Sequence, residues 1–254
     1  MRSPGFATWT AAITVSGSVA GWSEPAQALR PFDGTDAAVA GVGELELELE
    51  PLGLLRQGPE RTLIAPEMVL NLGVAEGWEA VLQGQGETAL PPSSAGVSLV
   101  ESGAFLKGII RDGVLQDKSG PSIATEFGIL LPGVNDESGF GASWLGIISY
   151  RFGPVTVHFN GGAALTRQRH GEVFLSTIIE GPYDWAIRPV AEIADDRETG
   201  IRETSSVLIG AIWQFRDHVA FDFGVREGRT NNRGLTEFRA GVTYALPLWR
   251  PRRD

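Results

Sequence analysis

The side chains of this chain that could perform catalysis are few. It has no cysteine and three histidines, His158, His170 and His218, so an activated nucleophile would have to use one of these as its base. A serine and a histidine share one face of a strand when they are two residues apart. His158 is followed by Phe159 and Asn160, without a serine at that spacing. We therefore expect no catalytic residue, and no enzyme activity such as lipid hydrolysis.

Motifs that hold cofactors or metals are also missing from the sequence. Phosphate-loop, dinucleotide-binding and zinc-protease patterns are absent, and the lack of cysteine excludes thiolate metal sites. The formal charge of −10 argues against nucleic acid as a partner, because phosphate neutralisation needs clustered basic residues. We expect neither a cofactor nor a bound metal.

Charged residues instead recur at every second position of apolar stretches. Glu44, Glu46, Glu48 and Glu50 alternate with leucines, so they form an acidic ladder on one face of a strand. We expect Glu67 to lie near Glu46. Like charges at this spacing repel each other, so water, a bound cation or Arg239 of the closing strand must compensate them.

Similar charges occupy the polar faces of most other expected strands. The interior of a soluble β-sandwich could not bury so many charges without a large desolvation cost, whereas a wet barrel interior could hold them. The residues expected to line such an interior are Glu44, Glu46, Glu48, Glu67, Lys107, Arg111, Glu126, Arg151, His158, Arg188, Glu192, Asp222, Arg226, Glu237 and Arg239.

Counting residues across the turns pairs some of these charges. Lys107 should lie opposite Glu126, and either Arg226 faces Glu237 or Asp222 faces Arg239. Such pairs either stabilise the wall of a plugged or narrow lumen or set the ion selectivity of a charged conduit.

The elements that carry these charges have a period of two from Glu44 onward, which is typical of strands with one apolar and one polar face. Most have close to the 9–11 residues that a tilted transmembrane strand needs. We predict an all-β fold, an antiparallel up-and-down transmembrane β-barrel of about twelve strands. The expected strands are 44–50, 63–74, 77–87, 100–112, 121–131, 142–152, 155–165, 172–181, 184–194, 204–215, 218–227 and 235–246.

The connections between these strands alternate between long and short, as they do in outer-membrane barrels with short periplasmic turns and long external loops. The long connections are expected at 51–62, 88–99, 132–141, 195–203 and 228–234.

Aromatic residues cluster at the strand ends beside the short turns, where the headgroup layer of a membrane would lie. We expect one aromatic girdle formed by Trp78, Tyr150, Phe152, Tyr183, Trp185, Trp213, Phe215 and Tyr244. Trp144, Phe174 and Phe238 lie nearer the long loops.

The start of the chain is typical of a targeting segment. Arg2 precedes a mostly apolar stretch, and Ala26-Gln27-Ala28 has the small residues of a cleavage site. The alternative is a disordered or helical N-terminus of a cytosolic protein. We predict a signal peptide at 1–28, a periplasmic N-terminal segment at 29–43, an outer-membrane barrel at 44–249 and a basic tail at 250–254.

Short motifs from about residue 97 to residue 246 resemble, in their order, a known bacterial family. They are Phe105-Leu106-Lys107-Gly108, Gly128-Ile129-Leu130-Leu131-Pro132-Gly133, His158-Phe159-Asn160-Gly161-Gly162, Pro189-Val190-Ala191-Glu192 and Phe221-Asp222-Phe223-Gly224-Val225-Arg226. The resemblance is to the putative MetA-pathway of phenol degradation proteins. It implies an outer-membrane barrel and a channel for hydrophobic or aromatic compounds. The sequence departs from the pattern at Leu131-Pro132-Gly133 and in the residues that follow Trp249.

Two classes of function remain open, and an outer-membrane lipid hydrolase is a weaker third alternative. The first is a porin-like transport channel of the Gram-negative outer membrane, which would take small solutes, including hydrophobic or aromatic ones, and have the lipid bilayer as its partner. The second is a non-conducting structural barrel whose external loops bind a partner; ion pairs and large inward residues such as Leu145, Ile147, Leu208 and Ile212 would favour it.

Overall fold

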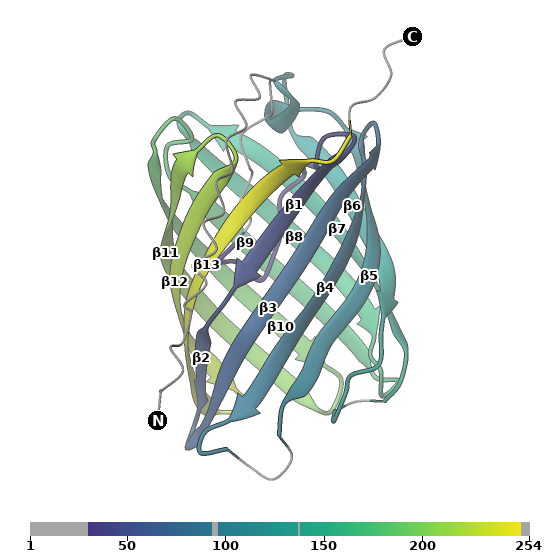
Figure 1. Ribbon diagram of the computed structural model, residues 1–254, viewed down its shortest axis with the longest axis vertical. Coiled ribbons are helices and arrows are strands. Elements are labelled where there is room, and N and C mark those ends of the chain that lie inside the picture. Colours follow the sequence, from purple (N-terminus) through teal and green to yellow (C-terminus); the bar gives the residue numbers. More distant parts are fainter. Residues whose placement is uncertain (1–29, 93–95, 137, 250–254) are drawn as a thin grey trace, which may run out of the picture.

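The computed structural model describes residues 30–92, 96–136 and 138–249, which form a closed antiparallel β-barrel (Figure 1). From β3 to β13 each strand pairs with its neighbours in sequence, and the last strand returns to the first. The elements are β1 (Glu44–Glu50), β2 (Gly53–Gln57), β3 (Glu60–Ala75), β4 (Trp78–Ala89), β5 (Ser98–Arg111), the 3₁₀ helix η1 (Val114–Gln116), β6 (Ser122–Leu130), β7 (Gly141–Phe152), β8 (Val155–Leu165), β9 (Gly171–Glu180), β10 (Ile187–Glu198), β11 (Arg202–Arg216), β12 (Val219–Thr230) and β13 (Arg233–Pro247).

The barrel closes through two short strands that share one position. β1 and β2 are separated by Pro51 and Leu52, and both pair with β13 on one side and with β3 on the other. Proline lacks the N–H group that a central strand would need, which explains the break. The thirteen strands therefore fill twelve positions around the barrel, and the predicted fold is confirmed.

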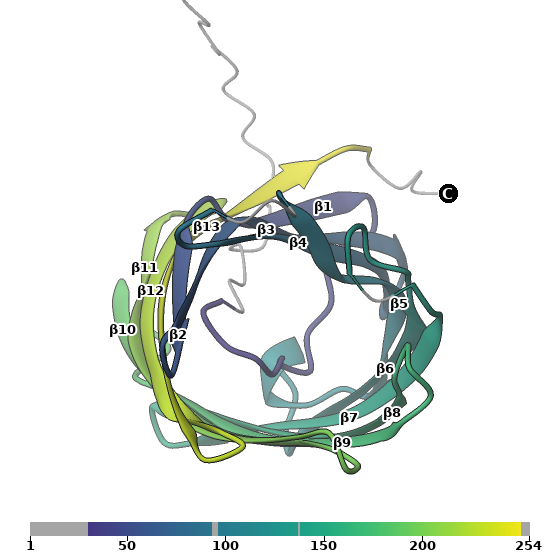
Figure 2. The ribbon, with the colours of Figure 1, turned by 90° about the horizontal axis from the view of Figure 1, so that it is seen from below.

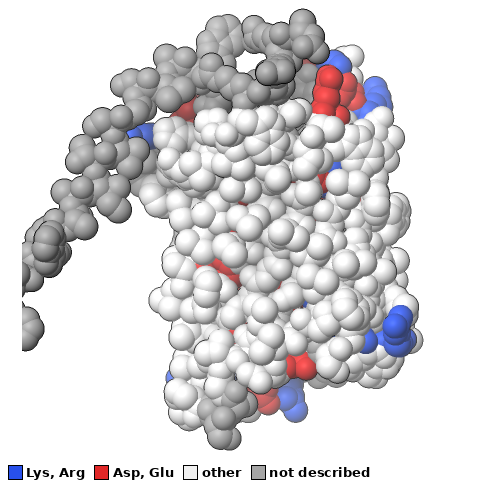
Figure 3. Space-filling model, turned by 45° about the vertical axis from the view of Figure 1, so that its right-hand side comes forward, with Lys and Arg blue, Asp and Glu red and all other residues white. Residues whose placement is uncertain are grey.

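The alternation of side chains separates an apolar outer surface from a polar interior. On β12, Phe221 is 41% exposed on the outside while its neighbour Asp222 is 5% exposed on the inside. Figure 3 shows the same division on one face of the molecule, with a middle zone that is mostly uncharged and the larger groups of charged atoms near the two ends. This arrangement suits a barrel whose middle zone contacts lipid. Within the described part of the chain, no helix is long and apolar enough to cross a membrane.

Several strands are longer than the sequence predicted, and the connections at one end are correspondingly shorter. Residues 51–62 form β2, a tight turn and the start of β3, while β10 and β11 are joined through only 199–201 and β12 and β13 through 231–232. The long connections expected at 51–62, 195–203 and 228–234 were therefore wrong. At these ends Asp195 and Arg197 replace apolar residues on the outer face, so the alternation that marks a strand disappears.

The aromatic residues named for the girdle lie near the end with the short turns. Tyr150 and Phe152 pack edge to face, as do Trp213 and Phe215. At the other end Trp144 and Phe238 are exposed, but Phe174 differs: it lines the interior, because its neighbours Val173 and Leu175 take the outward positions. That this ring of aromatics lies at a membrane interface stays a prediction.

Residues 30–43, which we call the belt, run inside the barrel (Figure 2). The sequence analysis placed this segment in the periplasm, but Arg30, Asp36 and Ala37 are all buried against the inner wall. The belt contains small and polar residues without a strand period, so nothing in its own pattern indicated where it would bind. It continues directly into β1 at Glu44.

Candidate functional site

The belt is anchored at its start by arginines of the last two strands. Arg239 on β13 donates to the carbonyl oxygen of Pro31 at 2.7 Å and to Asp33 at 2.6 Å. Arg226 on β12 contacts the other oxygen of Asp33 at 2.6 Å. Burial raises the pKa of Asp33, but the two guanidinium groups outweigh this effect and hold the pKa well below its ordinary value. Asp33 is thus a charged anchor of the belt.

Arg226 also lies opposite Glu237, with 2.5 Å between its Nη2 and the carboxylate. Of the two registers left open by the sequence, the structure has this one, and Asp222 lies opposite Gly241.

Arg30 of the belt compensates part of the acidic ladder. Its guanidinium binds Glu50 and Glu67 and lies 3.8 Å from Asp222. Glu67 lies opposite Glu50 and not near Glu46, which instead faces Asn71 on β3. The expected position of Glu67 was therefore wrong by four residues along β1. The compensating cation therefore comes from the belt, which sequence reasoning had placed outside the barrel.

The middle of the belt is held through its backbone. The amides of Asp33 and Gly34 donate to the carboxylate of Glu192 at 2.7 and 2.9 Å. The amide of Thr35 donates to Asn160 at 3.1 Å. A side chain at Gly34 would not fit, because a Cβ atom there would lie 2.4 Å from the hydroxyl of Ser176. Polar groups of the wall therefore replace the hydrogen bonds that the extended belt lacks.

Lys107 fixes the belt near the end with the short turns. The predicted register is confirmed, because Lys107 lies opposite Glu126. The ammonium group nevertheless contacts Glu79 at 3.3 Å and Asp36 at 3.7 Å, and it donates to the hydroxyl of Thr35. Glu126 makes no ion pair within the described residues. Lys107 therefore pairs with Glu79, its neighbour on β4, and with the belt rather than with Glu126, its neighbour on β6.

Apolar residues of the wall also pack against the belt. Ala37 packs on Ala124 and Ile147, and Phe32 packs on a cluster that contains Val190 and Ile212. The large inward residues that suggested a closed lumen thus contact the belt in particular.

A serine, a histidine and a glutamate on neighbouring strands form a buried chain that the sequence analysis missed. The hydroxyl of Ser149 lies 2.8 Å from Nδ1 of His158, and Nε2 of His158 lies 3.2 Å from Glu180. The serine faces His158 across the β7–β8 pair, so a search along one strand could not find it. The Ser149 hydroxyl is fully buried and accepts a hydrogen bond from the amide of Ala37. These three polar side chains therefore contribute to binding the belt.

The remaining charged positions lie at the barrel ends. Arg111 is exposed and donates to the carbonyl of Pro121, Arg151 stacks 4.3 Å above the ring of Tyr183, and Arg188 lies 3.3 Å from Glu180. Among the described residues, no group of three or more histidine, aspartate or glutamate side chains is placed to hold a metal ion.

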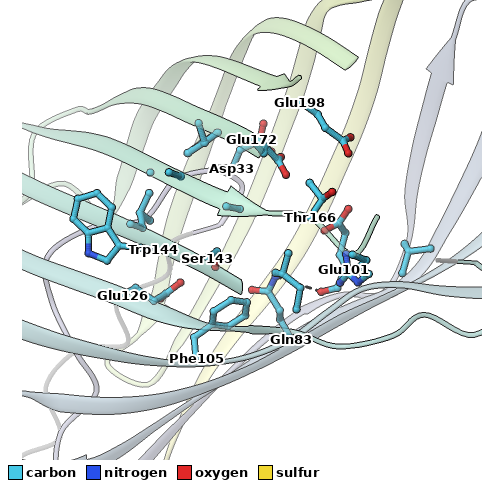
Figure 4. Close-up of a pocket in the computed structure, with 18 of the residues that line it drawn as sticks. Asp33, Gln83, Glu101, Phe105, Glu126, Ser143, Trp144, Thr166, Glu172 and Glu198 are labelled. Atoms are coloured by element: carbon cyan, nitrogen blue, oxygen red, sulfur yellow. Dashed lines mark hydrogen bonds between the residues drawn. The ribbon is translucent and has the colours of Figure 1, made fainter. Parts of the chain in front are cut away.

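Beside the belt, the interior retains two cavities of about 490 and 530 Å³, which share lining residues such as Glu126 and Phe174. The larger extends from Gln57 and Thr230, at the end with the loops, to Glu79 and Lys107 near the short turns. Figure 4 shows the smaller cavity, with Phe105 and Glu126 on one side and Glu172 on the other. Small inward residues, Ser143, Gly162 and Ala164, leave this space open.

The lining of the smaller cavity is strongly acidic. Among the residues that the structure describes, two basic ones line it, Arg167 and Arg202, and seven acidic ones do: Asp33, Glu87, Glu101, Glu126, Asp136, Glu172 and Glu198. Arg202 is itself bound to Glu172 and Asp196. A cavity lined by one sign of charge raises the local concentration of solutes with the opposite charge.

Comparison with known proteins shows the fold. No family model matches the sequence, and no curated protein sequence matches it. Among solved structures, the COG4313 outer membrane channel from Pseudomonas putida F1 has a TM-score of 0.61 at 9% identity, over 84% of this chain and 98% of that one. The KdgM porin has a TM-score of 0.53 at 12% identity, over 78% of this chain and 98% of its own. The chain thus has the fold of outer-membrane β-barrel proteins.

Proposed function

We propose that the protein is a channel of the Gram-negative outer membrane for the passive passage of small solutes, exported with a cleaved signal peptide. The observation that carries this proposal is the larger cavity, which extends along most of the barrel from Gln57 to Lys107. Interior side chains that are charged and adjoin open space are typical of a water-containing lumen. The fold shared with the COG4313 outer membrane channel and the KdgM porin agrees with this function.

The belt forms the floor of this channel. Ala40 donates its amide to Glu79, and the carbonyl of Ala37 accepts a hydrogen bond from Gln116 of η1. These contacts narrow the lumen at the end with the short turns. Solutes therefore pass beside the belt or after it shifts, which predicts a small conductance for the wild-type protein.

Hydrophobic or aromatic solutes, which the resemblance to the phenol-degradation family implies, are the finer part of the proposal. Phe105 and Phe174 give the smaller cavity apolar surface, in keeping with ligand sites that combine apolar walls with a few polar groups.

A non-conducting barrel is the second candidate, and the belt together with Ile147, Leu208 and Ile212 in the interior favours it. The partner-binding loops of that hypothesis are shorter than expected, since 199–201 and 231–232 are tight connections. A lipid hydrolase is less well supported, because the hydroxyl of Ser149 is buried under the belt.

Conductance of the refolded protein in planar lipid bilayers tests the proposal. We expect small, steady openings for the wild type and larger ones for Glu192→Ala, which removes the acceptor of two belt amides. Glu60→Gln, an exposed change far from the belt, is the matched control and should behave as the wild type. Absence of conductance in both the wild type and Glu192→Ala would favour the non-conducting barrel.

A further inference from the structure

Two rows of inward residues build the wall of the smaller cavity. One row crosses β6 to β9 as Glu126, Leu145, Gly162 and Phe174, each opposite the next. The parallel row begins at Phe105, continues through three small residues and ends at Glu172. Each side of the cavity therefore places a phenyl ring beside a carboxylate, with a shallow surface of small residues between them.

The two carboxylates differ in their surroundings. Glu172 is bound by Arg202 at 3.3 Å, so its charge is already compensated. Glu126 has no ion pair among the described residues, because Lys107 opposite to it contacts Glu79 and Asp36 instead. Glu126 lines both cavities, and Figure 4 shows it near Phe105. The side of the cavity formed by β5 and β6 thus offers a carboxylate that has no ion pair among the described residues, next to an aromatic ring.

From this geometry we propose that the cavity is a subsite for small organic cations, namely amines that carry an apolar or aromatic group. The ammonium group binds the carboxylate of Glu126 with Phe105 beside it, and the apolar part lies on the surface formed by Leu145 and Gly162. Carboxylates and aromatic faces together favour cations of this type. The volume of about 490 Å³ is within the range of roughly 300–1,000 Å³ that small-molecule sites have.

This inference deepens the proposed channel and rests on it, since it names the class of solute that the lumen accepts. The acidic lining excludes anions by repulsion. The class therefore differs from the oligogalacturonate that one KdgM porin structure contains, which carries the opposite charge.

Calorimetric titration of the refolded barrel in detergent tests the inference with three probes of similar size: benzylammonium, benzyl alcohol and benzoate. We expect benzylammonium to bind on the order of tenfold more tightly than benzyl alcohol, because charge-assisted contacts are roughly twice as strong as neutral ones. Benzoate should bind least. Equal affinity for benzylammonium and benzyl alcohol would overturn the inference.

Substitutions test whether Glu126 causes the preference for benzylammonium over benzyl alcohol. Glu126→Gln should remove the preference for benzylammonium and leave benzyl alcohol unchanged, whereas Glu60→Gln, the same change outside the cavities, should keep the preference. If Glu126→Gln does not fold, Phe105→Leu replaces it and should weaken benzylammonium more than benzyl alcohol. A Glu126→Gln or Phe105→Leu variant that binds all probes as the wild type does would contradict the assignment.

Bilayer recordings separate this inference from the proposed function. A barrel that conducts without discriminating benzylammonium from benzoate remains a channel, and the inference fails. A barrel that binds benzylammonium but never conducts retains the subsite, and the proposed function fails.

Discussion

Replacement of Lys107 by methionine tests whether the belt is held by charge. The Lys107 side chain is 2% exposed, and its partners Asp36 and Glu79 are 5% and 4% exposed. Loss of the ammonium group leaves two buried carboxylates close together without a cation. Removal of one partner of a buried ion pair costs about 3–5 kcal/mol, so we expect Lys107→Met to lower the free energy of unfolding by about that amount.

Urea titration in lipid vesicles, followed by the different gel mobilities of the folded and unfolded barrel, measures this loss. The second-site variants are the decisive control. Glu79→Gln should restore most of the stability, because Glu79 contacts Lys107 directly. Glu126→Gln should restore little, although Glu126 lies opposite Lys107 on β6. A stable single variant, or better rescue by Glu126→Gln, would refute the assignment of Asp36 and Glu79 as the ion-pair partners of Lys107.

Three further predictions concern the two faces, the belt and the N-terminus. Phe221→Arg should cost roughly 2–4 kcal/mol because it places a cation in lipid, whereas Asp222→Asn should cost less because Arg30 still binds Glu50 and Glu67; equal losses in urea unfolding would contradict the face assignment. The folded pKa of Asp33 lies below its ordinary value of 3.8, so its stabilisation is present above that value and is lost only as the pH falls through the lower folded pKa. Hydrogen exchange at about pH 4 should therefore show a protected Gly34 amide in the wild type and faster exchange in Asp33→Asn; the same rate in both would exclude this anchor. N-terminal sequencing of protein from outer membranes should begin at Leu29, and retention of Met1 would contradict export through a cleaved signal peptide.

The sequence predicted those parts of the barrel that depend on local alternation. Strand 44–50 and most of strand 218–227 were recognised because every second residue is apolar. The pair Lys107–Glu126 was predicted by counting across the linker between their strands, whereas Arg226–Glu237 was one of two registers that the sequence left open. Strand ends such as 195–198 were missed because both of their faces are polar where the barrel extends beyond its apolar zone.

The belt and its contacts could not be predicted in the same way. Its partners Asn160, Glu192 and Arg239 are more than 120 positions away, and no turn of defined length links them to the belt. Lys107 shows the consequence, since Glu126 was correctly placed opposite it on β6 while its ion-pair partners Asp36 and Glu79 were not identified. A shortage of cations near the acidic ladder was the one available indication that another segment must enter the barrel.

The position of Arg239 has a consequence for the order of assembly. This residue belongs to β13, the strand that closes the barrel against β1, and it also binds Pro31 and Asp33 at the other end of the chain. Sheet closure and filling of the interior therefore depend on the same strand, so neither is complete until synthesis and insertion of the final hairpin. An unclosed intermediate would expose residues 30–43 to proteases, and proteolysis at that stage would remove chains that lack a functional last strand.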